Sequence, residues 1–220
     1  EVERRVVYIS GPHGSGKSTL VRRLSEAPNL QVQEQLAHLE SLKEMVDRAI
    51  WRAALHAIEH RLNLRKASEN QGQVVIGDRC FFDDQTYWQA FVRIGWLTRD
   101  QLRGFTKMTD AIYRYSTTPM PTRIIILCPP LEWNVARVRQ RWEEGEHVKW
   151  NEDNLEYLGF VNEAFQKAAA RANGSCLVIE ATDLDERVRL IREWVDGRPE
   201  PGLSLVEAGR QTYRNLGGSD

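Results

Sequence analysis

The 220-residue chain carries 28% charged residues and a formal net charge of −1. This length suffices for one α/β domain with a sizeable core, and the charge balance does not demand nucleic acid or an anionic membrane as a partner. No apolar run approaches the roughly 20 residues that a membrane-spanning helix needs. The three cysteines are far apart and lack metal-ligand spacing, so we expect reduced thiols in a cytoplasmic protein.

The first predicted element is a buried strand at residues 6–9, which leads into a glycine-rich loop and a helix. The loop reads G-x-x-x-x-G-K-S from Gly11 to Ser18. In such a P-loop, backbone N–H groups and the helix N-terminus bind phosphate oxygens, and glycines let the backbone approach closely. We expect Lys17 to reach the β- and γ-phosphates of ATP and the Ser18 hydroxyl to ligate Mg²⁺. The residues predicted to contact the nucleotide are Gly11, His13, Gly14, Ser15, Gly16, Lys17, Ser18 and Thr19, with His13 as a loop residue rather than a catalyst.

Further strands and helices alternate along the rest of the chain. The apolar patterns predict strands at residues 30–34, 74–76, 124–127 and 177–179, and helices at 36–67, 83–94, 98–115, 133–141, 154–172 and 183–195. This alternation predicts an α/β P-loop NTPase fold, a five-stranded parallel sheet covered by helices on both faces. Residues 1–197 would form a single P-loop domain and 198–220 a loosely ordered tail. The long helix at 36–67 has apolar surface for the core or for a homodimer contact.

Charged residues stand where two of these strands end, at the edge where open α/β sheets bind ligands. Glu34 follows the second strand, and Asp78 and Arg79 follow the third. Glu34 is a candidate to accept a proton from a substrate hydroxyl or to hold a metal-bound water; otherwise it is an exposed strand-end residue. Arg79 would grip a substrate phosphate or order Glu34, and Asp78 would bind Mg²⁺ through water, unless the two form a purely structural ion pair.

An arginine-rich segment follows the fourth strand. Arg137, Arg139 and Arg141 alternate along a predicted helix, so they converge only where the segment bends, which Gly145 favours. Phosphoryl transfer needs positive charge around the transferring group. We therefore predict a lid at about residues 137–153 that closes over the phosphates. The alternative is a solvated face paired with nearby glutamates.

Four aromatic side chains are candidates to stack on a planar base, namely Trp51, Tyr87, Trp88 and Phe91. Aromatic residues at helical spacing more often pack in a core. Both interpretations therefore stay open for each of the four.

Together these motifs resemble the deoxynucleoside kinase family, which stands beside the thymidylate kinases. The resemblance covers roughly residues 5–195, through the P-loop, the strand-end glutamate, the acidic–arginine pair, and the motifs R-x-R-x-E-E (139–144) and L-E-Y-L (155–158). The resemblance implies roles for five side chains. Glu34 would be the general base, Arg79 the arginine of the family's E-R-S motif, Arg139 and Arg141 the lid arginines, and Asp84 the aspartate that helps to recognise the base.

The sequence departs from the family pattern on the acceptor side. E-R-S reads D-R-C (78–80), and D-R is closer to the thymidylate kinases. The long helix has no glutamine where the family reads the base edge, and Trp51 or Arg52 falls near that position. Glu34 is followed by Gln35 rather than proline, and the spacing from the lid to L-E-Y-L is longer. These changes leave ATP use intact and leave the acceptor open.

The sequence therefore predicts a kinase that uses ATP and Mg²⁺ to phosphorylate a nucleoside, a nucleotide or a related acceptor. The alternatives are a thymidylate-type monophosphate kinase, a kinase acting on a hydroxyl of a modified base in DNA, and a P-loop ATPase or GTPase switch. A switch is disfavoured because no guanine-reading N-K-x-D motif is recognisable. The acceptor side offers Glu34, Asp78, Asp83 and Asp84 against one clear cation, Arg79. This balance favours a nucleoside hydroxyl over an anionic monophosphate.

Overall fold

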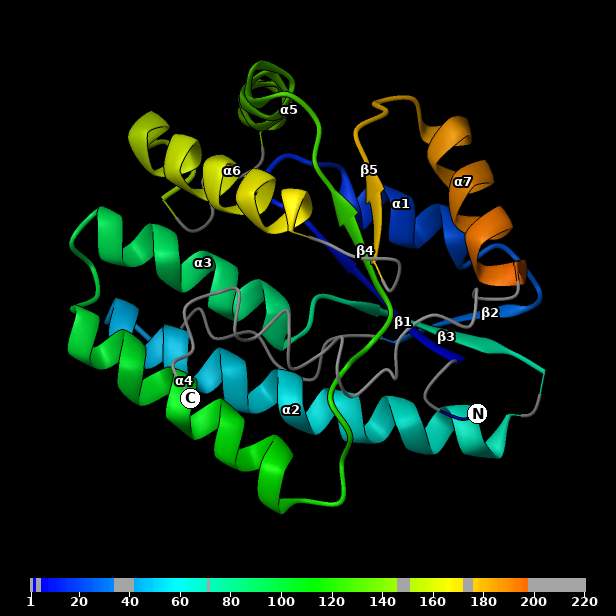
Figure 1. Ribbon diagram of the computed structural model, residues 1–220. Coiled ribbons are helices and arrows are strands. Elements are labelled where there is room, and N and C mark those ends of the chain that lie inside the picture. Colours follow the sequence, from blue (N-terminus) through cyan, green and yellow to red (C-terminus); the bar gives the residue numbers. More distant parts are fainter. Residues whose placement is uncertain are drawn as a thin grey trace.

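Five parallel strands form the centre of the fold, and seven helices surround them in the part of the chain that the structure describes (Figure 1). This computed structural model describes residues 2, 5–33, 42–70, 72–145, 151–171 and 176–197. The strands are β1 (Val6–Ser10), β2 (Leu30–Gln33), β3 (Val74–Asp78), β4 (Ile124–Leu127) and β5 (Cys176–Ile179). The helices are α1 (Lys17–Leu24), α2 (Met45–Glu69), α3 (Phe81–Arg93), α4 (Arg99–Tyr115), α5 (Leu131–Glu143), α6 (Leu155–Ala170) and α7 (Leu184–Asp196).

The sheet has the strand order β2-β3-β1-β4-β5, and every neighbouring pair is parallel. This confirms the predicted five-stranded parallel sheet. β1 lies in the middle, and Ile9 near its end is opposite Asp78 at the end of β3. The loop after β1 and the residues after β3 therefore leave the sheet side by side, at its carboxyl edge.

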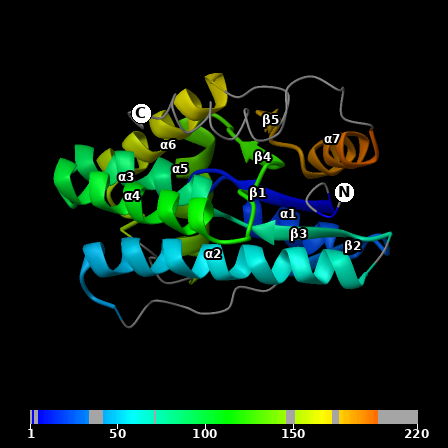
Figure 2. The same cartoon turned by 60° about the horizontal axis from the view of Figure 1, so that its bottom comes forward.

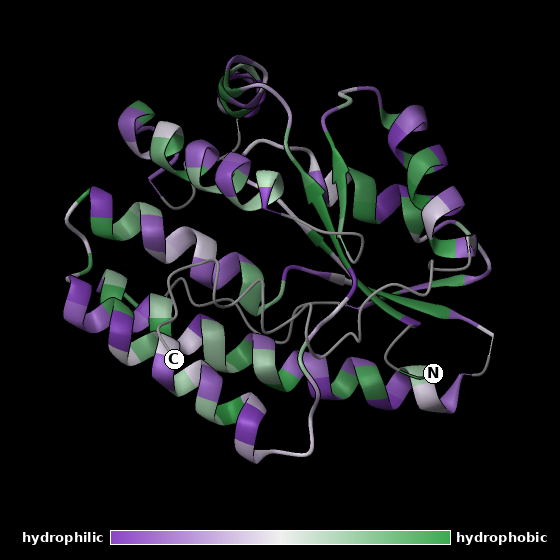
Figure 3. Ribbon diagram, viewed as in Figure 1, coloured by the Kyte–Doolittle hydropathy of each residue, from purple (hydrophilic) through white to green (hydrophobic). Residues whose placement is uncertain are grey.

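The two faces of the sheet have separate hydrophobic cores. Alternate residues of a strand point to opposite faces. Tyr8 of β1 accordingly joins the core under α2, α3, α4 and α6, whereas Ile9 joins the core under α1 and α7. Figure 2 shows α2 running along the first face, and Figure 3 shows apolar strands enclosed by helices that carry polar residues outward. Helices thus cover both faces, as predicted.

The long helix α2 begins later than the spacing of its leucines predicts. Leu42 and Lys43 precede the helix, and Glu44 at its N-cap has an extended backbone with φ −77° and ψ 131°. The side chain of Arg48 donates to the Leu42 carbonyl, which ties this segment to the first helical turn. The prediction of helix from residue 36 onward is therefore wrong for residues 42–44. The spacing of leucines indicates which side chains would share an apolar face, but it does not determine the backbone conformation.

Two helix starts show how far capping can be predicted. Thr98 and Gln101 form the expected capping box at α4, with hydrogen bonds of 2.8 and 3.1 Å. Helix α3 begins at Phe81, two residues before its predicted start. Its N-cap is Cys80, whose N–H donates to the Asp83 carboxylate at 3.0 Å. Cysteine is not among the preferred N-cap residues, so this helix start has no capping signal in the sequence.

Three predictions about the chain outside these elements remain. Among the described residues, no helix has the length and apolar character to span a membrane. On α2, Trp51 and Ile58 are 58% and 52% exposed, and the suggested homodimer contact stays a prediction. The tail at 198–220 and residues 146–150 of the predicted lid lie outside the described residues.

Candidate active site

The turn between β1 and α1 forms a tight loop around the N-terminus of α1. Gly14 and Gly16 have φ angles of 74° and 84°, in the left-handed region that glycine adopts without steric cost. A Cβ atom on Gly14 would lie 2.4 Å from the carbonyl oxygen of Asn134, so the loop also packs too closely there for any other residue. Left-handed residues in such a loop turn successive backbone N–H groups towards one side, which makes an anion-binding concavity.

The side chain of Lys17 folds back across this loop. Its Nζ donates to the carbonyl oxygens of Gly11 at 2.6 Å and Pro12 at 2.7 Å, and to Ser15 Oγ at 3.3 Å. Burial, together with the nearby cation Arg79, lowers the pKa of Lys17 to about 7. A phosphate group beside this amine would favour its charged form, and phosphate oxygens can take the place of the loop carbonyls.

Asp78 and Arg79 stand beside the loop at the end of β3. Arg79 has a φ of 70°, unusual for a residue with a side chain, and its N–H donates to the Ile9 carbonyl at 3.0 Å. Its guanidinium carbon lies 5.1 Å from the ring centroid of Tyr87. Burial by itself lowers the pKa of Arg79, but Tyr87 and the carboxylates of Asp83 and Asp78 outweigh burial and raise it. A left-handed arginine costs about 1–3 kcal/mol, which is typical of functional sites.

The carboxylate of Asp83 joins the start of α3 to the end of β1. Its Oδ2 accepts hydrogen bonds from the Ser10 hydroxyl and from the Cys80 N–H. Burial raises the pKa of Asp83, although Arg79 and Ser10 oppose this shift. Oδ2 of Asp83 therefore ties the end of β1 to the start of α3, whereas its Oδ1 is buried with no hydrogen-bond partner among the described residues.

Helix α2 contributes a buried partner for Asp84. His56 Nδ1 lies 2.8 Å from Asp84 Oδ2, and the two side chains are 1% and 5% exposed. Burial lowers the pKa of His56, but the nearby carboxylates, Asp84 above all, together outweigh burial and raise it. Arg52, one turn earlier, interacts electrostatically with Arg79, Asp84 and Glu59. Asp84 is thus held from α2 and not left free.

A chain of hydrogen bonds joins the P-loop to the end of the predicted lid and to the start of α6. His13 Nδ1 lies 3.0 Å from Glu152 Oε1, and His13 Nε2 lies 2.9 Å from the Tyr157 hydroxyl. Burial lowers the pKa of His13 to about 4, so the ring is neutral near pH 7. The carboxylate must accept from Nδ1–H, and Tyr157 then donates to Nε2. The second oxygen of Glu152 accepts from Arg141 Nη2 at 2.9 Å.

A family model described as "Deoxynucleoside kinase" matches residues 7–195. The chain belongs to the deoxynucleoside kinase family. The match spans every described strand and contains the P-loop, the β3 end and the Glu152 segment. Family membership makes the protein a nucleotide-binding phosphotransferase, as the sequence predicts.

Curated relatives of this family member are kinases as well. A protein named "Probable thymidylate kinase" from Methanosarcina acetivorans is 27% identical over 207 residues, covering 84% of this chain and 91% of its own. Another of the same name, from Metallosphaera sedula, is 24% identical over 176 residues, covering 76% of this chain and 81% of its own. These relatives support a nucleoside or nucleotide kinase.

Solved structures of similar fold include deoxyadenosine kinase from M. mycoides. Its complex with dATP has a TM-score of 0.65 and 15% sequence identity, covering 87% of this chain and 99% of that chain. Its complex with dCTP has a TM-score of 0.60 and 14% sequence identity, covering 87% of this chain and 98% of that chain. At this identity the likeness concerns the fold, which is that of the P-loop kinases.

The structure of this deoxynucleoside kinase family member brings several of the predicted site residues together. Lys17 interacts electrostatically with Asp78, Arg79, Asp83 and Glu152. Around them lie the remaining predicted loop residues, of which Gly11, His13 and Ser15 are buried, Gly14, Gly16 and Thr19 are partly buried, and Ser18 is exposed. Cationic and acidic groups thus converge on the P-loop, as phosphoryl transfer requires.

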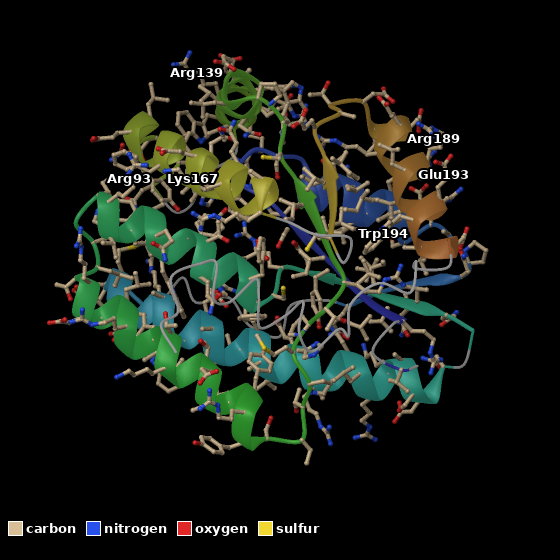
Figure 4. All side chains as sticks on the ribbon, in the orientation of Figure 1. Arg93, Arg139, Lys167, Arg189, Glu193 and Trp194 are labelled. Atoms are coloured by element: carbon tan, nitrogen blue, oxygen red, sulfur yellow. The ribbon has the colours of Figure 1, made fainter. Side chains whose placement is uncertain are left out.

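Other predicted residues lie elsewhere. Arg139 is exposed, and Figure 4 shows it on the outward side of α5. Trp51 is exposed on α2. Trp88 is 1% exposed and packs edge-on against Phe105, so this structure uses it as a core residue and the stacking role suggested for it is not kept. Glu34, the expected general base, lies outside the described residues.

The residues present fit a Mg²⁺ ion held mainly by the nucleotide. The Ser18 hydroxyl is exposed at the start of α1, and Asp78 Oδ1 is buried with no hydrogen-bond partner among the described residues. Both are hard oxygen donors, which Mg²⁺ prefers, and it usually takes only one or two protein ligands beside phosphates and waters. In the described part of the chain, no cluster of three or more His, Cys, Asp or Glu side chains could hold a metal by itself.

Sequence reasoning missed two partners in this site. His56 pairs with Asp84 across 28 positions, and Glu152 pairs with His13 across 139. Neither pair has a motif spacing. The only local signal for Glu152 is its place shortly before the L-E-Y-L motif, where Asn154 caps α6 and accepts from the Tyr157 N–H at 3.0 Å.

Proposed function

We propose that this protein transfers the γ-phosphoryl group of ATP to a hydroxyl group of a deoxynucleoside or a closely related acceptor. The observation that carries the proposal is the buried amine of Lys17, held inside the P-loop beside Asp78 and Arg79 at the carboxyl edge of the sheet. Membership of the deoxynucleoside kinase family supports the reaction class.

On the donor side, the P-loop would bind the β-phosphate through backbone N–H groups. Lys17 would exchange the carbonyl oxygens of Gly11 and Pro12 for phosphate oxygens. Ser18 and Asp78 would hold Mg²⁺, which, when bound, neutralises charge on the β- and γ-phosphates. Arg141 is within reach of the loop through Glu152 and His13, so it is the lid arginine best placed to meet charge that develops during transfer.

On the acceptor side, the structure revises the simple count of acidic groups. Asp83 accepts from Ser10 and Cys80 and interacts electrostatically with Arg79, and Asp84 pairs with His56, so both carboxylates already have partners within the protein. The preference for a hydroxyl acceptor then rests on Glu34 as the general base. A nucleoside hydroxyl is a weak nucleophile and needs such a base, whereas a monophosphate is already anionic.

A second candidate is a thymidylate-type monophosphate kinase. Curated relatives from three organisms carry the name thymidylate kinase or probable thymidylate kinase. Arg52 also interacts electrostatically with Arg79, so two cations lie near the end of β3. An anionic acceptor needs such cations, and a hydroxyl acceptor does not.

One experiment separates these functions. The purified protein is incubated with Mg²⁺ and γ-labelled ATP, alone and with each of the four deoxynucleosides, their monophosphates and duplex DNA. Label on a deoxynucleoside supports the proposal. Label only on a monophosphate supports the second candidate, label on DNA would indicate a base-modifying kinase, and phosphate release that no acceptor stimulates would indicate an ATPase switch.

A further inference from the structure

A buried arginine on α7 contacts the outer side of the P-loop. Arg187 lies in the first helical turn of α7, and the residue is 2% exposed. Its Nη1 donates to the Ser15 carbonyl at 2.6 Å, and its Nε donates to the Ala181 carbonyl at 2.6 Å. The guanidinium therefore connects the P-loop to the segment between β5 and α7.

The same guanidinium packs against the glycine that precedes Lys17. A Cβ atom on Gly16 would lie 2.8 Å from Arg187 Nη1 and 3.5 Å from the Trp133 ring. The guanidinium carbon lies 5.0 Å from the centroid of that ring. Gly16 is thus enclosed by Arg187 and Trp133 on the side that a side chain would occupy.

This contact bears on phosphate binding because a peptide unit points its N–H and its C=O in opposite directions. For the N–H of Gly16 to face the phosphate concavity, the Ser15 carbonyl of the same peptide must face outward. A buried outward carbonyl needs a donor, and Arg187 supplies a charged one. A charge-assisted hydrogen bond is about twice as strong as a neutral one, so it can hold the peptide in this orientation before the nucleotide arrives.

We propose that Arg187 is a positioning residue for the donor nucleotide, which holds the Ser15–Gly16 peptide with its N–H directed at the phosphates of ATP. The inference rests on the proposed role of the P-loop as the ATP site. It also assigns Trp133 a part, because the indole covers the guanidinium face and keeps water from competing for the Ser15 carbonyl.

A purely structural role for Arg187 makes different predictions. The N-cap of helix α7 does not depend on Arg187, because the Asp183 side chain accepts from the Glu186 N–H at 2.8 Å. If Arg187 serves only to pack α7 against the P-loop, its replacement would change the thermal stability of the protein and leave the ATP affinity of the folded fraction unaltered. If Arg187 positions the P-loop, its replacement would weaken the binding of the phosphates of ATP.

The test compares Arg187→Ala and Arg187→Lys with wild type, and uses Arg189→Ala as the matched control on the same helix. Arg189 is exposed and pairs with Glu193 at 2.8 Å (Figure 4). Calorimetry measures Mg²⁺-ATP and adenosine binding, and thermal unfolding shows which variants are folded. We expect Arg187→Ala to weaken ATP binding by roughly 10- to 100-fold, the range for a hydrogen bond to a charged group, with adenosine binding changed much less. Arg187→Lys should bind ATP with intermediate affinity. An ammonium group can donate to the Ser15 carbonyl, but it lacks the planar fork that also reaches the Ala181 carbonyl.

Chemical rescue of ATP affinity provides a second test, because added guanidinium would not restore ATP affinity if the role of Arg187 were purely structural. Guanidinium ions at low millimolar concentration should restore part of the ATP affinity of Arg187→Ala, and ammonium ions should restore less. ATP binding by both folded variants at wild-type strength would overturn the inference, as would loss of folding in both, because the arginine would then serve the fold. If wild type itself fails to bind Mg²⁺-ATP, the proposed function fails instead.

Discussion

His13 of the P-loop and Glu152, 139 residues later in the chain, form a buried hydrogen bond of 3.0 Å. Glu152 also accepts from Arg141 at 2.9 Å. Burial raises the pKa of Glu152, but hydrogen bonds and electrostatic attraction from His13 and Arg141 outweigh burial and lower it to about 2. The carboxylate therefore stays charged at any physiological pH, and it keeps an arginine of the predicted lid within reach of the loop.

His13 should make the stability of the protein depend on pH below neutrality. Its pKa is about 4 in the folded state and 6.5 ordinarily, so between those values the unfolded state takes up a proton that the folded state does not. Stability is present above pH 6.5 and falls as the pH drops towards 4, by up to about 3 kcal/mol for this group. Urea unfolding from pH 7 to pH 4 should show a shallower decline in His13→Gln than in wild type. Burial also lowers the pKa of His60 to about 4. His60 therefore contributes the same decline in stability to wild type and to His13→Gln. Parallel curves would show that His13 does not titrate in this window.

Lys17→Ala should abolish phosphoryl transfer and leave the fold intact. The amine donates its hydrogen bonds to oxygens of the P-loop, so its removal breaks contacts within that loop and leaves the packing of helices on the sheet unchanged. Transfer of label from ATP to the acceptor measures activity, and the thermal unfolding midpoint is the control. Near-full activity with Mg²⁺-ATP would contradict the kinase proposal.

Glu34→Gln should lower kcat by about 10²–10⁴ with ATP affinity little changed, if Glu34 is the general base. The change keeps the shape of the side chain and removes its ability to accept a proton. Steady-state kinetics with the acceptor and calorimetry with ATP separate the two effects. Lost ATP binding would point to a metal-binding role, and unchanged turnover would exclude Glu34 from the site.

Arg141→Ala and Arg139→Ala form a matched pair on α5. Arg141 bonds to Glu152, whereas Arg139 is exposed on the outward side of the helix. If the lid closes over the phosphates, Arg141→Ala should lower kcat by at least 10-fold, and more than it weakens ATP binding, because contacts to developing charge act in the transition state. Arg139→Ala should have the smaller effect. Normal turnover in both variants would mean that the arginines form a solvated face.

His56→Leu should affect the acceptor and not the donor. The substitution leaves the buried carboxylate of Asp84 without its 2.8 Å partner, which costs roughly 1–3 kcal/mol of stability. We expect a higher KM for the acceptor and an unchanged KM for ATP. His56→Gln, which retains a donor group, serves as the conservative control. A change in the KM for ATP of similar size would place His56 outside the acceptor side.

Much of the fold follows from local patterns in the sequence. The strand positions, the P-loop and the Thr98 cap depend on residues close together in the chain, and the structure confirms them. The starts of α2 and α3 differ from the prediction, because an extended Glu44 and a cysteine N-cap leave no local signal in the sequence.

The candidate site was less accessible to prediction, because its decisive contacts join distant segments. Asp83 is held by Ser10 at the end of β1, and Asp84 is held by His56 on α2, and neither pairing has a signal in the local sequence. Arg187 reaches Ser15 across 172 positions and belongs to no motif. Such contacts depend on which helices the sheet brings together, and residue spacing does not contain that information.

The two separate cores of the sheet have a consequence for how this enzyme can change. The core under α1 and α7 supports the P-loop and Arg187, whereas the core under α2, α3, α4 and α6 supports Asp84 and His56. The two cores share only the strands, through side chains that point in opposite directions. Helices α3 and α6 also contact the P-loop, through Tyr87 and Tyr157, so substitutions that change acceptor choice are best confined to α2. Directed evolution of new acceptors should accordingly begin with libraries in α2, and variants changed only there should retain nucleotide binding at the P-loop.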